Sequence, residues 1–105
     1  MDFNQEETLN YTIGNIDFVV KRKTDANWTQ NHAPRKTYIL AYACSGQAQY
    51  ITPQGIFPVS KGNVLFFKKN QEDTATSHAE DPWTFITIAF DLIPLDDKTP
   101  LQFDQ

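Results

Sequence analysis

The residues of this chain that could act as nucleophiles, bases or metal ligands are few and scattered. The 105 residues include two histidines, His32 and His78, and one cysteine, Cys44. Hydroxyl groups that a nearby base could activate stand at Ser45, Ser60 and Ser77. None of these residues lies in a recognisable motif for nucleophilic catalysis, so we predict no catalytic residues. A single cysteine excludes an intramolecular disulfide, and no CxxC motif indicates a structural zinc.

Each of these side chains also has an ordinary structural role. His32 follows the polar residues Trp28-Thr29-Gln30-Asn31 and is interpreted as a solvated loop histidine, as is His78. Cys44 stands inside an apolar run, which favours a small buried hydrophobe with an inert thiol.

Residues that could line a small-molecule pocket are more plentiful, since aromatic residues make up 13% of the chain. Aromatic faces can cover the apolar surface of a bound ligand, and polar groups can complete hydrogen bonds to it. The candidate ligand-binding set is Trp28, Arg35, Tyr42, Tyr50, Phe66, Phe85 and Thr87. For each aromatic residue the alternative role is to fill the interior of a small barrel.

Short strands must position these residues, because the hydrophobic pattern has a period of two rather than a helical period. Ile16, Phe18 and Val20 alternate with other residues and predict the first strand. Further strands are predicted at Tyr38 to Cys44, Ala48 to Thr52, Ile56 to Val59, Val64 to Phe67 and Trp83 to Phe90. Residues 69–82 lack either period and are predicted to be mostly loop, with room for one short edge strand.

Turn residues separate these runs at short intervals. Pro53-Gln54-Gly55 indicates a hairpin, Ser45-Gly46 ends a strand, and Gly62 stands where a positive φ is expected. Brief strands between such turns are typical of an all-β sandwich or barrel. Within the last run, one of the two alternating sets is the more apolar and suits packing against another layer: Thr84, Ile86, Ile88 and Phe90.

Composition limits the classes of partner. The chain is long enough for one compact core, so we expect a single domain over residues 1–105. Its net charge of −4 and pI of about 4.9 argue against nucleic-acid binding by this chain alone. No run reaches the roughly 20 apolar residues of a membrane span, and no signal peptide is visible, which favours a cytoplasmic location.

The order of landmarks between residues 28 and 90 resembles the sensor domain of AraC-type transcription regulators. The landmarks are Trp28, Arg35, Tyr38-Ile39-Leu40-Ala41-Tyr42, Ser45-Gly46, Gly62-Asn63-Val64-Leu65-Phe66-Phe67, Asp81-Pro82-Trp83 and Phe90. The resemblance implies a cupin-like double-stranded β-helix, an antiparallel jelly-roll barrel.

The resemblance also implies a function. Such a barrel binds a small-molecule effector, often a sugar or related metabolite, and changes how a C-terminal helix-turn-helix domain, absent from this chain, engages DNA. Residues 1–9 would form a flexible arm over the ligand, and linking helices usually dimerise family members, which leaves a homodimer open. Phe85 and Thr87 match pocket positions of sugar-binding members, but they are not the residues of the arabinose sensor. Arg35 either replaces that sensor's key arginine or anchors the strand entrance.

Many cupins are metalloenzymes, and their ligand motifs can be counted onto this chain. Counted from Gly46, the glutamate position falls on Ile39 and the histidine positions fall near His32 and Pro34. The histidine of the second motif falls on Asp73. Two ligands at most are fewer than a catalytic metal needs, so we predict no metal and no cofactor.

The leading interpretation is therefore a non-catalytic effector-binding module. A small cupin enzyme, such as a sugar isomerase, epimerase or dioxygenase, is the alternative, and a scaffold with a filled barrel is a third.

Overall fold

The computed structural model describes residues 10–100, which form strands and turns with no helix in that range. The strands are β1 (Tyr11–Lys23), β2 (Thr29–His32), β3 (Tyr38–Ser45), β4 (Gln47–Thr52), β5 (Gly55–Ser60), β6 (Val64–Phe67), β7 (Asp73–Ser77) and β8 (Thr84–Pro94). The prediction of an all-β chain is confirmed. No helix within this range is long and apolar enough to cross a membrane.

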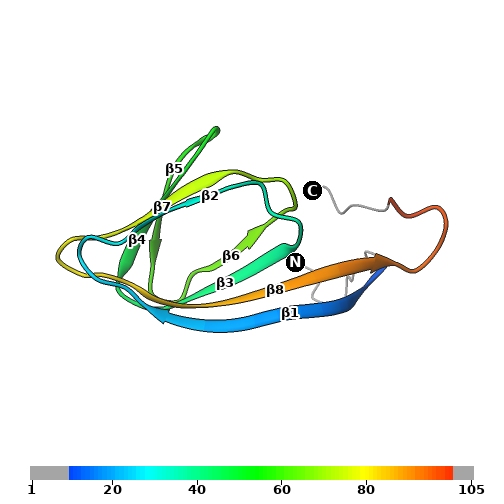
Figure 1. The fold of residues 1–105 in the computed structure, drawn as a ribbon, viewed down its shortest axis with the longest axis horizontal. Helices are drawn as coiled ribbons and strands as arrows, with labels where there is room; N and C mark the ends of the chain where they lie inside the picture. Colours follow the sequence, from blue (N-terminus) through cyan, green and yellow to red (C-terminus); the bar gives the residue numbers. More distant parts are fainter. Residues whose placement is uncertain (1–9, 101–105) are drawn as a thin grey trace, which may run out of the picture.

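The strands form two four-stranded antiparallel sheets that face each other (Figure 1). The strand order is β1-β8-β3-β6 in one sheet and β2-β7-β4-β5 in the other. Successive strands pass from one sheet to the other, except for the β4–β5 hairpin. This is the double-sheet jelly roll expected from the sequence.

The predicted turns have the expected backbone. Pro53 and Gln54 join β4 to β5, where Thr52 lies opposite Gly55. Gly62 has φ of 90°, a conformation that glycine adopts without steric penalty. Gly46 has φ of 76°, and a Cβ there would lie 2.2 Å from the Pro82 carbonyl oxygen. This close approach brings the end of β3 against the residues that lead into β8.

The prediction that residues 69–82 are mostly loop is wrong for the middle of this segment, which forms a strand. β7 lies there, and it is an inner strand of the second sheet between β2 and β4, not an edge strand. Its inward residues are Asp73 and the small Ala75, so the run has no large apolar side chain to produce a period of two. The edge strand β2, which was not predicted, is polar for the same reason.

The register of β1 against β8 shifts twice, and the bulge between Ile16 and Phe18 changes which residues share a face. Ile16 lies opposite Phe90, but Phe18 lies opposite Ala89, the adjacent residue of β8. One extra residue on one strand turns the following side chains to the other face. The alternation that grouped Ile16 with Phe18 and Val20 is therefore interrupted.

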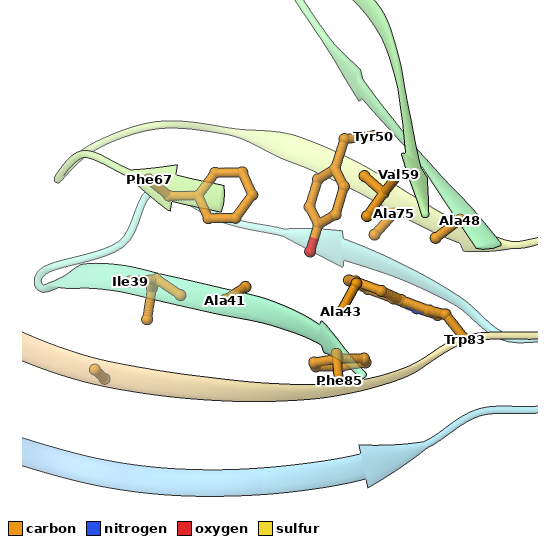
Figure 2. Close-up of a cluster of buried hydrophobic side chains, with 11 residues drawn as sticks. Ile39, Ala41, Ala43, Ala48, Tyr50, Val59, Phe67, Ala75, Trp83 and Phe85 are labelled. Atoms are coloured by element: carbon orange, nitrogen blue, oxygen red, sulfur yellow. The ribbon is translucent and has the colours of Figure 1, made fainter. Parts of the chain in front are cut away.

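The core fills one end of the space between the sheets (Figure 2). Trp83 is fully buried and its ring stacks on Phe85 with the centroids 4.2 Å apart. Alanines line much of the remaining inner surface: Ala41, Ala43, Ala48, Ala75 and Ala89. Small side chains from both sheets leave room beside this packed end.

The outer face of the β1-β8-β3-β6 sheet is also rich in apolar residues. Ile86 and Ile88, which were expected to pack against another layer, lie on this outer face and are partly exposed. Within the described residues, they are not covered by a second layer. The ring of Tyr38 stacks on Phe66, with the centroids 5.7 Å apart, and lies 6.1 Å from that of Phe90. Cys44 is only partly buried on this face, so it is not the core residue that was predicted.

Candidate functional site

A cavity of about 270 Å³ lies between the two sheets, beside the packed end of the core. Strands of both sheets contribute to its wall, because residues that alternate along each strand point inward. The lining residues are Phe18, Val20, Arg22, Gln30, His32, Arg35, Ile39, Tyr50, Phe67, Phe85 and Thr87.

The cavity opens between the edge strands β1 and β2. In the described range β1 pairs only with β8, and β2 pairs only with β7, so no backbone ladder joins the two edges. Phe18 and Val20 on β1 line the cavity and remain 47% and 37% exposed. On the β1 side, Phe18 and Val20 make the opening apolar up to Arg22 at the end of the strand, and on the β2 side Gln30 and His32 make it polar.

Arg22 reaches this opening from the end of β1. It lies opposite Phe85 in the ladder, just as Val20 lies opposite Thr87, so all four face the space between the sheets. The Arg22 guanidinium donates one hydrogen bond to the side-chain oxygen of Gln30, at 3.4 Å. This contact is the side-chain bridge between the two edge strands at the opening.

A buried carboxylate holds two of the lining residues in place. The Asp73 side chain has no exposed surface, and both its oxygens accept hydrogen bonds. The Arg35 guanidinium donates to it at 2.9 and 3.3 Å in a bidentate arrangement, and His32 Nδ1 lies 2.6 Å from Oδ1. Charge-assisted pairs of this geometry are strong and directional.

Arg35 is held on further sides as well. Its side chain is 12% exposed, and its Cζ lies 4.8 Å from the centroid of the Phe67 ring. Its backbone carbonyl accepts a hydrogen bond from the Asn70 amide at 2.8 Å. The guanidinium is therefore positioned before any ligand arrives.

His32 is not the solvated loop histidine that the sequence suggested, because it lies on β2 with its side chain only 19% exposed. Burial lowers the pKa of the His32 ring, and the nearby Arg35 charge lowers it further, while Asp73 partly opposes both. The neutral ring is favoured, with the Nδ1 proton donated to Asp73. His78 is exposed after β7, as expected.

Aromatic rings form the inner wall of the cavity. The Tyr50 side chain projects from β4 toward the opposite sheet, beside Phe67 and above Phe85 in the view of Figure 2. Its ring centroid lies 4.9 Å from that of Phe67 and 6.4 Å from that of His32. Burial raises the pKa of the Tyr50 hydroxyl, which makes no hydrogen bond within residues 10–100. A neutral hydroxyl in a cavity wall can donate to or accept from a ligand.

The structure brings four of the candidate ligand-binding residues together and separates three. Arg35, Tyr50, Phe85 and Thr87 line the cavity. Trp28 packs behind this wall, with its ring 5.7 Å from that of Phe85. Tyr42 and Phe66 lie on the outer face of their sheet, so the expectation that they line the cavity is wrong.

Sequence reasoning missed seven lining residues: the apolar Phe18, Val20, Ile39 and Phe67, and the polar Arg22, Gln30 and His32. Arg22 could have been found, because continuing the alternation of Phe18 and Val20 by one step reaches it. Gln30 and His32 carried no comparable signal, since β2 is short and polar.

The donor set around Asp73 does not fit a divalent metal. Both carboxylate oxygens are already paired with Arg35 and His32, and a guanidinium cannot act as a metal ligand. The described residues contain no group of three or more His, Cys, Asp or Glu side chains that could hold an ion.

A family model described as the AraC-like ligand binding domain matches residues 15–97. No curated protein sequence matches the chain significantly.

Solved structures share the fold. A predicted oxalate decarboxylase from Thermotoga maritima has a TM-score of 0.65 at 12% identity, covering 71% of this chain and 66% of that one. A Cupin 2 conserved barrel domain protein from Salinispora arenicola has 0.62 at 11% identity, covering 87% and 71%. An HTH_3 family transcriptional regulator from Vibrio cholerae has 0.58 at 13% identity, covering 77% and 51%. The chain spans 66%, 48% and 62% of the first three solved structures it matches, and likenesses at these identities show the fold alone.

Proposed function

The chain belongs to the family of AraC-like ligand-binding domains, and on that basis we propose that it senses a sugar or related small metabolite for a bacterial transcription regulator. The effector occupies the cavity between the sheets, and the regulator works in the cytoplasm. DNA binding resides in a separate C-terminal domain, and a homodimer is compatible with this arrangement.

The observation that carries the proposal is the mixed character of the cavity wall. Aromatic rings from Tyr50, Phe67 and Phe85 stand beside polar groups such as Gln30 and Thr87. Ligand sites are typically concave, mostly apolar and supplied with a few placed polar groups. The cavity is small, which suits a ligand of about the size of a monosaccharide. Phe85, Thr87, Tyr50 and Arg35 are the predicted site residues that remain in this proposal.

Regulation requires the effector to bind two arrangements of the regulator with different affinity, since equal affinity shifts no equilibrium. The lining residues come from both sheets, so a ligand can bias how the edge strands β1 and β2 sit against each other. The proposed arm over residues 1–9 lies outside the described residues. One solved structure with this fold is itself a transcriptional regulator, which makes the role a reasonable one for the fold.

A cupin enzyme is the alternative, and a relative by fold is described as a predicted oxalate decarboxylase. The pairing of Asp73 with Arg35 and His32 argues against it, because those groups stabilise one another instead of leaving ligands for a metal. The open cavity likewise argues against a filled scaffold.

Thermal unfolding with a panel of neutral and acidic sugars tests the proposal. A compound at a hundred times its dissociation constant adds about 2.7 kcal/mol of stability, which raises the Tm of a domain of this size by roughly 10 to 20 °C. Thr87→Phe, which fills the cavity, should abolish the rise, whereas Thr87→Ser should preserve it. A panel with no rise in Tm, or a rise that survives Thr87→Phe, would contradict the proposed site.

A further inference from the structure

We propose that the effector is an anion, a small hydroxylated metabolite whose carboxylate or phosphate group is bound by Arg22 at the cavity opening. This inference rests on the proposed function and names the ligand class of that site. It follows from how the charged side chains are distributed around the cavity.

The charged residues that line the cavity are both cations. Among residues 10–100, Arg22 and Arg35 are in the wall, and no aspartate or glutamate is. The carboxylate of Asp73 contacts two lining residues, but its side chain has no exposed surface and is paired with Arg35 and His32. The cavity is cationic although the whole chain carries a net charge of −4.

The two arginines differ in what already neutralises them. Arg35 forms a bidentate pair with Asp73, so its charge is compensated within the fold. Arg22 has only the neutral side-chain oxygen of Gln30 at 3.4 Å and forms no ion pair within residues 10–100. An inward-facing guanidinium without a counter-ion is suited to binding a carboxylate or phosphate, often through two parallel hydrogen bonds.

The strand register makes this placement specific to Arg22. Lys21 and Lys23 flank it, and because side chains alternate along β1, they point to the other face. They add positive potential near the opening without entering it. Of the basic residues at positions 21–23, Arg22 is therefore the one that can contact a ligand directly.

The other lining residues restrict what the uncharged part of the effector can be. Phe85 and Phe67 provide apolar surface, and Gln30, Thr87 and the Tyr50 hydroxyl provide hydrogen-bonding groups. A cavity of about 270 Å³ has no room for a long acyl chain. A sugar acid or a sugar phosphate fits all three conditions: charge at the opening, hydroxyls inside and a small volume.

Isothermal titration with matched probes tests this inference. The probes are galactose with galacturonate, glucose with glucuronate, and glucose 6-phosphate, which separates a carboxylate from a phosphate. At least one anionic probe should bind about tenfold more tightly than its neutral counterpart, because a charge-assisted hydrogen bond is worth 1.5 kcal/mol or more. The preference should weaken at high salt, since Arg22 is exposed.

Variants assign the effect to Arg22. Arg22→Gln should weaken binding of the anionic probe about tenfold and leave a neutral sugar nearly unchanged, while Arg22→Lys should retain part of the preference. Lys61→Gln removes the same charge from an exposed turn between β5 and β6 and should change neither. Circular dichroism checks that all variants fold.

The outcomes separate the two proposals. If a neutral sugar binds as tightly as its acid, or if the preference survives Arg22→Gln, this inference is wrong and the proposed function stands. If no probe binds the natural sequence, the proposed sugar-sensing function is contradicted together with this inference.

Discussion

The carboxylate of Asp73 fixes the positions of the polar side chains Arg35 and His32 in the cavity wall. It replaces the solvent that Arg35 and His32 would lose on burial, and it fixes the direction of both side chains. A buried ion pair contributes little net stability compared with apolar packing, but removing one partner leaves the other charge uncompensated. The pairing of Asp73 with Arg35 therefore contributes more to the geometry of the site than to the net free energy of unfolding.

This argument predicts a large effect of Asp73→Asn. The variant leaves the mostly buried guanidinium of Arg35 without its counter-ion, so the free energy of unfolding should fall by about 3 kcal/mol. Urea denaturation measures the change. Asp97→Asn, which alters an exposed carboxylate, should change the free energy by less than about 0.5 kcal/mol. Equal losses in the two variants would show that the Asp73 pairings carry no special weight.

The lowered pKa of His32 predicts how stability depends on pH. The folded state favours the neutral ring, whereas His32 in the unfolded chain has the ordinary histidine pKa of 6.5. As the pH falls through this value, the unfolded chain therefore takes up a proton at His32 more readily than the folded chain does. The stabilising contribution is complete above this pKa and is lost as the pH falls toward the lower folded value. The free energy of unfolding should therefore decrease from about pH 7.5 to about pH 5.5.

Variants at the two histidines assign this dependence. His32→Gln should reduce the difference in unfolding free energy between the two pH values, because it removes the titrating group. His78→Gln, at an exposed loop position, should leave most of the difference in place. A natural sequence and a His32→Gln variant with the same pH dependence would exclude this role for His32.

At the scale of elements, two glycines with positive φ allow a matched comparison. Gly46→Ala combines a left-handed backbone with a Cβ 2.2 Å from the Pro82 carbonyl oxygen, whereas Gly62→Ala places its Cβ in open space. The conformational cost alone is about 1 to 2 kcal/mol. Urea denaturation should thus show a loss of that size for Gly62→Ala and a clearly larger loss for Gly46→Ala. Similar losses would mean that the β3–β4 turn does not press against the entry to β8.

The sequence predicts strands where large apolar residues alternate or run together, and fails where small or polar residues face inward. β3, β6 and β8 carry enough aromatic and branched residues to be recognised directly. β7 has Asp73 and Ala75 at its inward positions, so its place inside a sheet depends on the Arg35 pairing and on neighbouring strands. Neither is visible in a window of five residues.

Errors in the candidate site arise from the assignment of faces. Tyr42 and Phe66 are large and aromatic, yet they lie on the outer face, and the inner positions of β3 hold Ala41 and Ala43. Size alone therefore does not identify a cavity residue, because space inside a barrel requires small side chains. The bulge in β1 adds a second difficulty, since one extra residue exchanges the two faces.

At the scale of the whole molecule, the topology that encloses the cavity joins segments far apart in the chain. β1 pairs with β8, so that Tyr11 lies opposite Pro94, and β2 pairs with β7. Of the strand pairs in the described residues, only β4 and β5 form a hairpin between sequence neighbours. Each non-local pairing must overcome the entropy of closing a long loop before it gains contacts.

Folding should therefore be slow for a domain of this size, with a relaxation in the millisecond to second range. The fluorescence of Trp28 and Trp83 reports on folding. Trp28 directly precedes β2 and Trp83 directly precedes β8, and these strands belong to opposite sheets. The two indole rings lie 6.1 Å apart in the folded state. Stopped-flow refolding followed by tryptophan fluorescence measures the rate at which these sheets associate. Trp28→Phe keeps Trp83 as the single reporter and should give the same rate once corrected for its effect on stability. A relaxation in microseconds would contradict the idea that closing the cavity depends on the pairing of the first and last strands.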